Sequence, residues 1–320
     1  MDDIAVGTLI ASTLRVSTPL ILCALAGCLS ERSGVIDLGL EGKMLLTAFS
    51  AGAAAAVFGS LPLAMAIALV VGVALSMLHG YACVSHRGDQ VVMGMAITMT
   101  AAGLTVVLGI AWFHQGGQTP ALPDAARLAP WFALSADTLA GLPTALKALA
   151  IGLLGHNGMV YVALALVPLV WWTLARTRFG LRLRAAGENP AMVDAAGVSV
   201  QRLRYAALAL NGGLCALAGS YLVLAQNPSF IPHMTAGRGY MALAAMIFGK
   251  WRPVGAFFAC LLFGFLDALA IRLQGAPLPL VGAVPVQAIQ ALPYLLTVVL
   301  LAGFIGRARA PKALGVPYAR

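Results

Sequence analysis

The chain has 320 residues, of which 61% are apolar and only 10% are charged. Soluble domains carry about 25% charged residues, so a water-soluble fold, and with it a soluble enzyme, is excluded. The formal charge of +9 would also suit a nucleic-acid-binding protein. The basic residues, however, lie between apolar runs and at the C-terminus, as in membrane proteins that keep positive loops in the cytoplasm, so no nucleic-acid partner is expected.

Long apolar runs predict an all-α polytopic membrane protein with about nine transmembrane helices. A span needs roughly 20 apolar residues, and the alternating pattern of barrel strands is absent. The runs cover residues 8–30, 44–58, 61–83, 91–113, 158–175, 205–225, 240–249, 253–271 and 284–305. We expect the first run to be a retained span, because the residues before it lack the basic region of a cleaved signal peptide. Residues 1–320 are treated as a single transmembrane domain.

Cysteine usage indicates packing and not redox chemistry. The five cysteines lie in apolar segments without a C-x-x-C pair, at Cys23, Cys28, Cys83, Cys215 and Cys260. We expect all of them to be small buried residues.

The distribution of Lys and Arg predicts an orientation. Residues 176–204 carry Arg176, Arg178, Arg182, Arg184, Arg202 and Arg204, so this connection is placed in the cytoplasm. Counting crossings outward from it places the N-terminus outside and the tail, residues 306–320, in the cytoplasm. Residues 114–157 are rich in Pro and Gly and poor in charge, which predicts an exterior loop. The apolar part of that loop, residues 139–154, is expected to form a helix lying on the membrane surface.

Two segments, near residues 33–43 and 233–249, do not fit ordinary spans. The first contains Asp37, Glu41 and Lys43, which are costly in lipid and should therefore line a cavity or lie at a protein interface.

In the second segment, the apolar run 240–249 is too short for a bilayer core of about 30 Å. Its helix must therefore begin earlier, near His233, or be broken around Gly237 and Gly239. Glycine-interrupted segments in both halves of the chain hint at a duplicated unit around a transport pathway.

No catalytic or metal site is predicted. Gly42-Lys43 and Gly249-Lys250 look like the end of a phosphate loop, but Met and Trp follow where Ser or Thr is required. The five histidines show no helical pairing: His79, His86, His114, His156 and His233. We therefore expect a transport component without a cofactor or an ATP site of its own, driven by another chain or by an ion gradient.

Residues 184–197 predict a short helix with firm ends. Asn189 is a good N-cap, Pro190 suits the first helical position and Gly197 suits a left-handed C-terminal cap, so the helix should have about seven residues. Because arginines flank it at the cytoplasmic face, it is either a docking element or an ordinary amphipathic loop helix.

The same segment, G-E-N-P-A-M-V-D-A-A-G, resembles the cytoplasmic coupling segment of permeases from ABC importers of the branched-chain amino acid, ribose and nucleoside group. Three further segments resemble the nucleoside-type branch of this group, whose receptors are basic membrane lipoproteins. They are E-R-S-G-V-I-D-L-G-L-E-G-K-M-L at 31–45, D-Q-V-V-M-G at 89–94 and A-G-R-G-Y-M-A-L-A-A-M-I-F-G-K-W-R-P-V-G-A at 236–256. The resemblance extends from about residue 31 to residue 267. Asp37 is a departure, because the family often has Asn there.

The resemblance implies a permease domain in the bacterial inner membrane, surrounded by membrane lipid. Its partners would be a second homologous permease, an ATP-binding subunit with two nucleotide sites and an external substrate-binding lipoprotein. ATP and Mg would be bound by the partner ATPase. The residues expected to couple to that ATPase are Gly187, Glu188, Asn189, Pro190, Asp194 and Gly197.

Isolated polar side chains in the apolar segments are candidates for the translocation pathway, where they would hydrogen-bond a neutral polar solute. They are Glu41, Gln90, Thr98, Asn211, Gln287 and Gln290. The alternative role of Asn211 is close helix packing, because small residues share its face. Asp267 lies in an apolar span, so it should face protein or water, and Arg272 is expected to pair with it.

The sequence therefore predicts import of a small polar solute, a nucleoside or purine, by alternating access driven by ATP on a partner chain. Two alternatives stay open at this point. One is an ion-coupled secondary transporter, and the other is an ABC permease for a sugar or a branched-chain amino acid.

Overall fold

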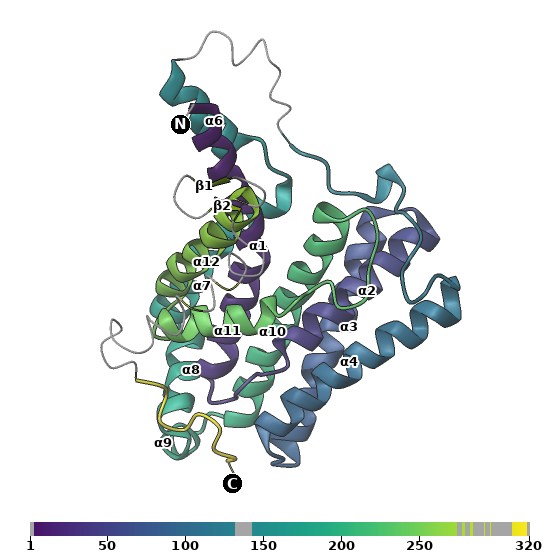
Figure 1. Ribbon diagram of the computed structural model, residues 1–320. Coiled ribbons are helices and arrows are strands. Elements are labelled where there is room, and N and C mark those ends of the chain that lie inside the picture. Colours follow the sequence, from purple (N-terminus) through teal and green to yellow (C-terminus); the bar gives the residue numbers. More distant parts are fainter. Residues whose placement is uncertain are drawn as a thin grey trace.

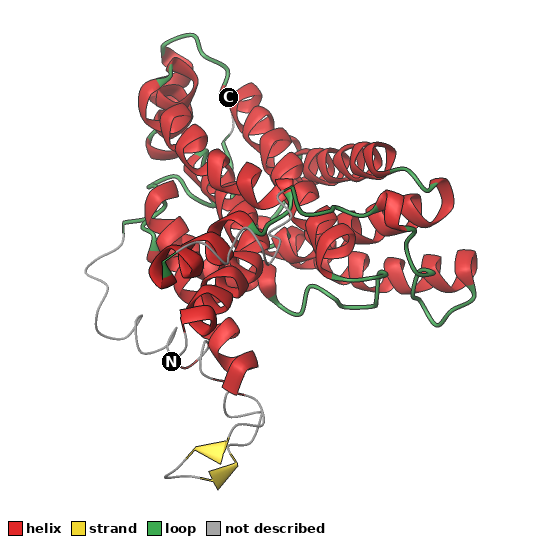
Figure 2. Ribbon diagram, turned by 90° about the horizontal axis from the view of Figure 1, so that it is seen from above, coloured by secondary structure: helices red, strands yellow, loops and turns green. Residues whose placement is uncertain are grey.

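The computed structural model describes residues 3–131, 143–273, 277–278, 282–283, 291, 295 and 309–318 of the chain. This part is almost wholly helical (Figures 1 and 2). Its helices are α1 (Asp3–Arg32), α2 (Leu40–Phe58), α3 (Leu61–Gly80), α4 (Gln90–Phe113), α6 (Thr144–Leu154), α7 (Gly158–Arg176), α8 (Arg178–Glu188), α9 (Pro190–Ala195), α10 (Val200–Tyr221), α11 (Arg238–Phe248) and α12 (Pro253–Leu273). Short elements are the π-helical turns η1 (Tyr81–Ser85) and η3 (Leu222–Gln226), the 3-10 turn η2 (Asp124–Ala126), and the antiparallel pair β1 (Pro277–Leu278) and β2 (Gly282–Ala283).

Within the described ranges, 6 helices are long and apolar enough to cross a bilayer. They are α1, α3 with η1, α4, α7, α10 with η3, and α12. α2 carries two charges in its first turns and α11 has only 11 residues, so neither belongs to this group. The ninth predicted span, residues 284–305, lies outside the description except for single positions. The all-helical membrane fold is thus confirmed, whereas the count of nine crossings is not.

α1 and α10 form the centre of the bundle, and α4 lies at its edge (Figure 1). The most apolar part of α10 is 78% buried within the protein, against 22% for α3 and for α4. The exposed side chains of these outer helices are nevertheless apolar, as at Val70, Met99 and Val107. An apolar face without a protein partner suits contact with lipid tails.

The cysteines, the start of α11 and the helix after the long loop can each be compared with the sequence predictions. The five cysteines are free and buried, as expected. α11 begins at Arg238 after Gly237, whose φ of +80° ends the preceding turn, so the helix is broken and does not start near His233. The helix expected within residues 139–154 is α6, and it packs along the first turns of α1, where Gly7 approaches Ala148.

The expected pairing of Asp267 with Arg272 is wrong. The salt bridges of the described chain do not include this pair. Arg272 donates instead to the main-chain carbonyl of Ala5 at the start of α1. Five residues along a helix carry the two side chains to different faces, and tertiary contact with α1 then decides where Arg272 binds.

α3 and α10 meet backbone to backbone. A Cβ added to Gly72 would lie 2.5 Å from the carbonyl oxygen of Gly212, and one added to Gly212 would meet the carbonyl of Gly72. In membranes such small residues allow the close approach that holds helices together without a hydrophobic driving force. The small-residue face predicted around Asn211 is therefore a packing surface.

Gly212→Ala should destabilise the protein by about 1–3 kcal/mol, because the added methyl group overpacks this crossing. Gly213→Ala is the matched control on the same helix, since its Cβ would meet only Leu69 at an ordinary 3.5 Å. In a helix interior Gly→Ala otherwise stabilises, by up to about 1 kcal/mol. Thermal unfolding in detergent should lower the midpoint for Gly212→Ala and leave or raise it for Gly213→Ala. Equal midpoints for the two variants would contradict the close packing.

Candidate functional site

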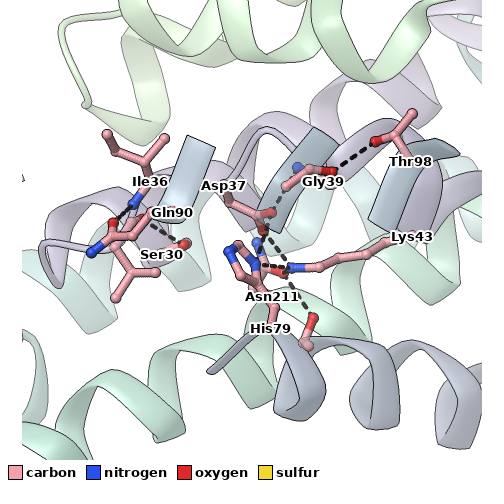
Figure 3. A network of polar contacts seen from close by, with 12 residues as sticks. Ser30, Ile36, Asp37, Gly39, Lys43, His79, Gln90, Thr98 and Asn211 are labelled. Carbon is pink, nitrogen blue, oxygen red and sulfur yellow. Dashed lines mark hydrogen bonds and ion pairs between the residues drawn. The ribbon is translucent and has the colours of Figure 1, made fainter. Parts of the chain in front are cut away.

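A buried network of polar side chains lies at the break between α1 and α2, which we name the α1–α2 turn (residues 33–39). Asp37, in this turn, accepts a hydrogen bond of 2.6 Å from the ammonium group of Lys43 on α2. Nδ1 of His79, on α3, lies 3.3 Å from Asp37 and 3.2 Å from Lys43 Nζ. The three side chains point toward one another (Figure 3). All three are 0% exposed.

α10 completes this network through Asn211. Its Oδ1 accepts hydrogen bonds of 3.1 Å from Lys43 Nζ and from the Ser76 hydroxyl (Figure 3). Lys43 therefore has three polar partners for its three N–H groups, contributed by the turn, by α3 and by α10. A buried ammonium is tolerated when its donors are satisfied and a carboxylate neutralises it, and both conditions hold here.

The second irregular segment is joined to the first by Glu41. Its carboxylate accepts hydrogen bonds from the backbone N–H groups of Gly237, at 2.8 Å, and of Gly239, at 2.6 Å. These groups are at the N-terminus of α11, where unpaired donors and the helix dipole favour a negative charge. Gly239 has no room for a side chain, since a Cβ would lie 2.5 Å from the backbone of Glu41. The two glycine-interrupted segments are thus in direct contact.

The pathway candidates that lie within the described residues are all in or next to the network around Lys43 or the contact between α2 and α11. Gln90 is buried, and its Oε1 accepts a 2.7 Å hydrogen bond from the backbone of Ile36 in the α1–α2 turn. Thr98 bonds to its own helix, and its backbone packs against Gly42 of α2. Glu41 and Asn211 have the contacts given above. Gln287 and Gln290 lie outside the described residues.

Sequence reasoning missed three members of the network: Lys43, His79 and Ser76. The sequence marks Lys43 only as costly in lipid, and His79 has no metal-ligand spacing that would single it out. The available signal was a lone ionisable or polar side chain within an apolar segment, which in membranes marks a functional site by default.

The predicted short helix is present as α9, with 6 residues. The Asn189 side chain accepts a 3.2 Å hydrogen bond from the backbone of Met192, Pro190 is the first helical residue, and Gly197 has a φ of +78°. These are the caps expected from the sequence.

α8 and α9 enclose an open groove of about 570 Å³. Leu181 and Met192, which are 62% and 69% exposed, line it together with the polar residues Glu188 and Asn189. Exposed apolar side chains beside polar ones, on a segment rich in arginine, are typical of a protein-binding surface.

Gly187, another coupling candidate, faces the body of the protein. Gly187 is buried against the Arg32 carbonyl and the backbone of Gly34, and a Cβ would not fit there. The main chain of Ala313, in the C-terminal tail, donates a 2.8 Å hydrogen bond to the Gly187 carbonyl. The end of α8 therefore lies directly on the α1–α2 turn.

The tail makes three further contacts with this region. Tyr318 donates a 3.1 Å hydrogen bond to Asp194 on α9, and Gly315 donates one of 3.1 Å to the carbonyl of Gly34. Arg204 of α10, itself buried, donates to the carbonyls of Ser33 and Val316. The tail, α9 and the α1–α2 turn are thus joined by main-chain and side-chain hydrogen bonds.

Lys43→Met should cost about 3–5 kcal/mol, because it leaves the Asp37 carboxylate buried without its cation. The double variant Asp37→Asn/Lys43→Met should recover most of this loss, since neither charge remains. Thermal unfolding and the yield of folded protein in mild detergent would measure both. If the losses of Asp37→Asn and Lys43→Met simply add in the double variant, the two side chains are not paired.

Comparisons with known proteins identify the family. The family model described as "Branched-chain amino acid transport system / permease component" matches residues 9–304. The guanosine ABC transporter permease protein NupQ of Bacillus subtilis is 37% identical, covering 99% of this chain and 98% of its own length. The nucleoside ABC transporter permease protein NupC of Lactococcus lactis is 36% identical, with 97% and 96% covered.

Among solved structures, one titled as an inward-facing conformation of an ABC transporter assigned to the metal-chelate type aligns with a TM-score of 0.50 and 16% identity, covering 92% of this chain and 84% of that one. At this sequence identity, the similarity supports only the assignment of the fold. Together with the match of the family model over nearly the whole length, it agrees with the bundle described above. The chain belongs to the branched-chain amino acid transport system permease family and is a multi-pass permease subunit of an ABC importer in the inner membrane.

Proposed function

We propose that this permease carries purine nucleosides into the cytoplasm. The observation that carries the proposal is the similarity, over at least 96% of both chains, to two permeases named for guanosine and nucleoside transport. The neutral pathway candidates Gln90, Thr98 and Asn211 suit an uncharged polar solute better than an ion. The proposed assembly contains a second, homologous permease, an ATP-binding subunit that holds ATP and Mg at two sites, and an external substrate-binding lipoprotein.

The proposed orientation has the N-terminus outside and residues 176–204 and 306–320 in the cytoplasm. The arginines of the connection support it through the positive-inside bias. The contacts of Ala313 with Gly187 and of Tyr318 with Asp194 are consistent with it, because they keep the described part of the tail and the connection on the same side.

The groove between α8 and α9 is the proposed contact with the ATP-binding subunit. Leu181 and Met192 would be buried by the partner, and Glu188, Asn189 and Pro190 would fix its register. Gly187, Asp194 and Gly197 act differently, because they hold the groove in shape and against the rest of the protein.

Motion would pass from the groove to the pathway through packed contacts. A shift of α9 would move the end of α8, and Gly187 there is in contact with the backbone of Arg32, at the end of α1, and of Gly34 in the α1–α2 turn. Through Glu41, α2 is attached to the N-terminus of α11. Alternating access then consists of coupled movements of the turn and α11, driven by closure of the partner on ATP.

Glu41, Gln90, Thr98 and Asn211, together with Gln287 and Gln290, are proposed to meet the solute. Two observations support the amide side chains in this role. Nε2 of Gln90 and Nδ2 of Asn211 are buried and have no hydrogen-bond partner within the described residues. Such donors are costly to leave unpaired, and a solute reaching them after the turn moves would satisfy them.

Reconstitution tests the function. The four-component assembly in liposomes should accumulate radiolabelled guanosine when ATP is enclosed on the side of the ATP-binding subunit. Unlabelled adenosine should compete, whereas ribose and branched-chain amino acids should not. Uptake by the permease alone under an ion gradient would identify a secondary carrier and refute the proposal.

Charge and polarity changes in the groove test the coupling. Glu188→Lys/Met192→Glu should lower guanosine uptake by about tenfold or more, since burying two mismatched charges at a contact costs several kcal/mol. ATP hydrolysis should lose its dependence on the loaded receptor, while membrane insertion stays intact. Arg202→Gln, exposed on the same connection but outside the groove, is the control and should transport normally. Unchanged uptake in the double variant would exclude the groove as the docking site.

The buried cysteines allow a direct test of the orientation. Arg178→Cys and Gln115→Cys each place one exposed thiol on a background of buried ones. A membrane-impermeant maleimide should label Gln115→Cys in cells with an opened outer membrane, and Arg178→Cys only after the inner membrane is permeabilised. The reverse pattern would place the connection outside and remove the basis for docking to an ATPase.

A further inference from the structure

A second cavity, of about 870 Å³, lies where the ends of α1, α7 and α8 meet the turn between α11 and α12. We name it the basic pocket. Its lining includes four cations and two tryptophans: Arg32, Arg184, Lys250, Arg252, Trp171 and Trp251. Neither the docking groove nor the α1–α2 network uses this cavity.

Positive charge predominates among the described residues that line the basic pocket. Among the described residues that line it there is no Asp or Glu, and none of the four cations takes part in a salt bridge of the described chain. Glu31, which is nearby, is buried and accepts a hydrogen bond from the indole of Trp251. Nε of Arg184 is shielded from solvent and has no hydrogen-bond partner in the described structure. Such a set of donors is suited to a ligand with several anionic oxygens.

The turn between α11 and α12, which lines the basic pocket, is held in place by contacts within the protein. Lys250 and Trp251 both have a φ of +55°, a conformation that residues other than glycine rarely adopt. The turn is held by Arg32, whose Nε donates a 2.9 Å hydrogen bond to the carbonyl of Trp251, and by the indole bond to Glu31. The backbone of this strained turn is thus fixed by the buried Glu31 and the half-buried Arg32, and the exposed side chains of Lys250 and Arg252 start from it.

The basic pocket lies at the depth of lipid headgroups. α1 and α7 end here and α12 begins here, so the cavity is at the end of three candidate spans. Trp171 and its neighbour Trp172 are 43% and 54% exposed, as expected for side chains at a membrane interface. Basic pockets between transmembrane helices on the cytoplasmic side bind anionic headgroups.

We propose that the basic pocket binds the phosphate of an anionic phospholipid, of the phosphatidylglycerol or cardiolipin class, with the glycerol and acyl chains leaving along Trp171. The cations surround the phosphate, and the tryptophans contact the glycerol backbone. The leaflet involved is the cytoplasmic one in the orientation proposed above. Binding itself depends neither on that orientation nor on the transported solute.

The test titrates the purified transporter complex in neutral detergent with dioctanoyl-phosphatidylglycerol and follows tryptophan fluorescence. Binding should saturate and be about tenfold or more tighter than for dioctanoyl-phosphatidylcholine, given four cations at the site. Lys250→Asn/Arg252→Gln, two exposed positions outside helices, should weaken it by about 25-fold, or about fivefold per cation. Arg178→Gln/Arg202→Gln removes the same charge from cytoplasmic positions outside the pocket and should leave binding unchanged. Arg252→Lys, which keeps the charge, should retain most of the affinity and shows that the turn still folds.

Three outcomes would overturn the proposal. The two lipids could bind equally, the control pair could lose as much affinity as the pocket pair, or inorganic phosphate could displace the lipid at comparable concentration, which would make the site one for free phosphate. None of these results depends on guanosine uptake, so a failure here is distinguishable from a failure of the proposed function.

Discussion

The ammonium group of Lys43 has to be neutralised inside a protein that is surrounded by lipid, and the arrangement around it follows from that requirement. Asp37 supplies the opposite charge, and His79 and Asn211 bring α3 and α10 to the remaining donors. Because this buried cation on α2 has partners from three other segments, it fixes the relative positions of all four more strictly than apolar packing alone would. The α1–α2 turn can leave the regular helical geometry because this network and Gln90 hold it.

The same turn connects the two surfaces that a permease has to coordinate. On one side Gly187 and the tail lie against its backbone, and on the other Glu41 holds the N-terminus of α11. These contacts are made mainly by main-chain groups and by glycines without space for a side chain. A displacement on the α8–α9 side therefore cannot be absorbed by the rotation of a long side chain and has to move the turn itself.

Local rules predicted the local structures. Asn189, Pro190 and Gly197 define α9 because capping depends on a few adjacent residues, and the glycines before Tyr240 indicate the break before α11. Long-range pairing was not predictable in this way. Lys43 and Asn211 are 168 positions apart, and Glu41 and Gly237 are 196 apart, so nothing in either local sequence identifies the partner. The wrong pairing of Asp267 with Arg272 has the same origin, because proximity in sequence does not imply contact in space.

The backbone contact between Gly72 and Gly212 has a mechanical consequence. Helices that touch main chain to main chain, without intervening side chains, cannot slide or tilt past one another without steric overlap, so α3 and α10 behave as one rigid plate. Any movement would therefore occur where the backbone is irregular, in the two glycine-interrupted segments near residues 33–43 and 233–249 that are in contact through Glu41. In the proposed transport cycle α3 and α10 would act as a stiff frame, and the two irregular segments joined by the Glu41 carboxylate would act as neighbouring hinges.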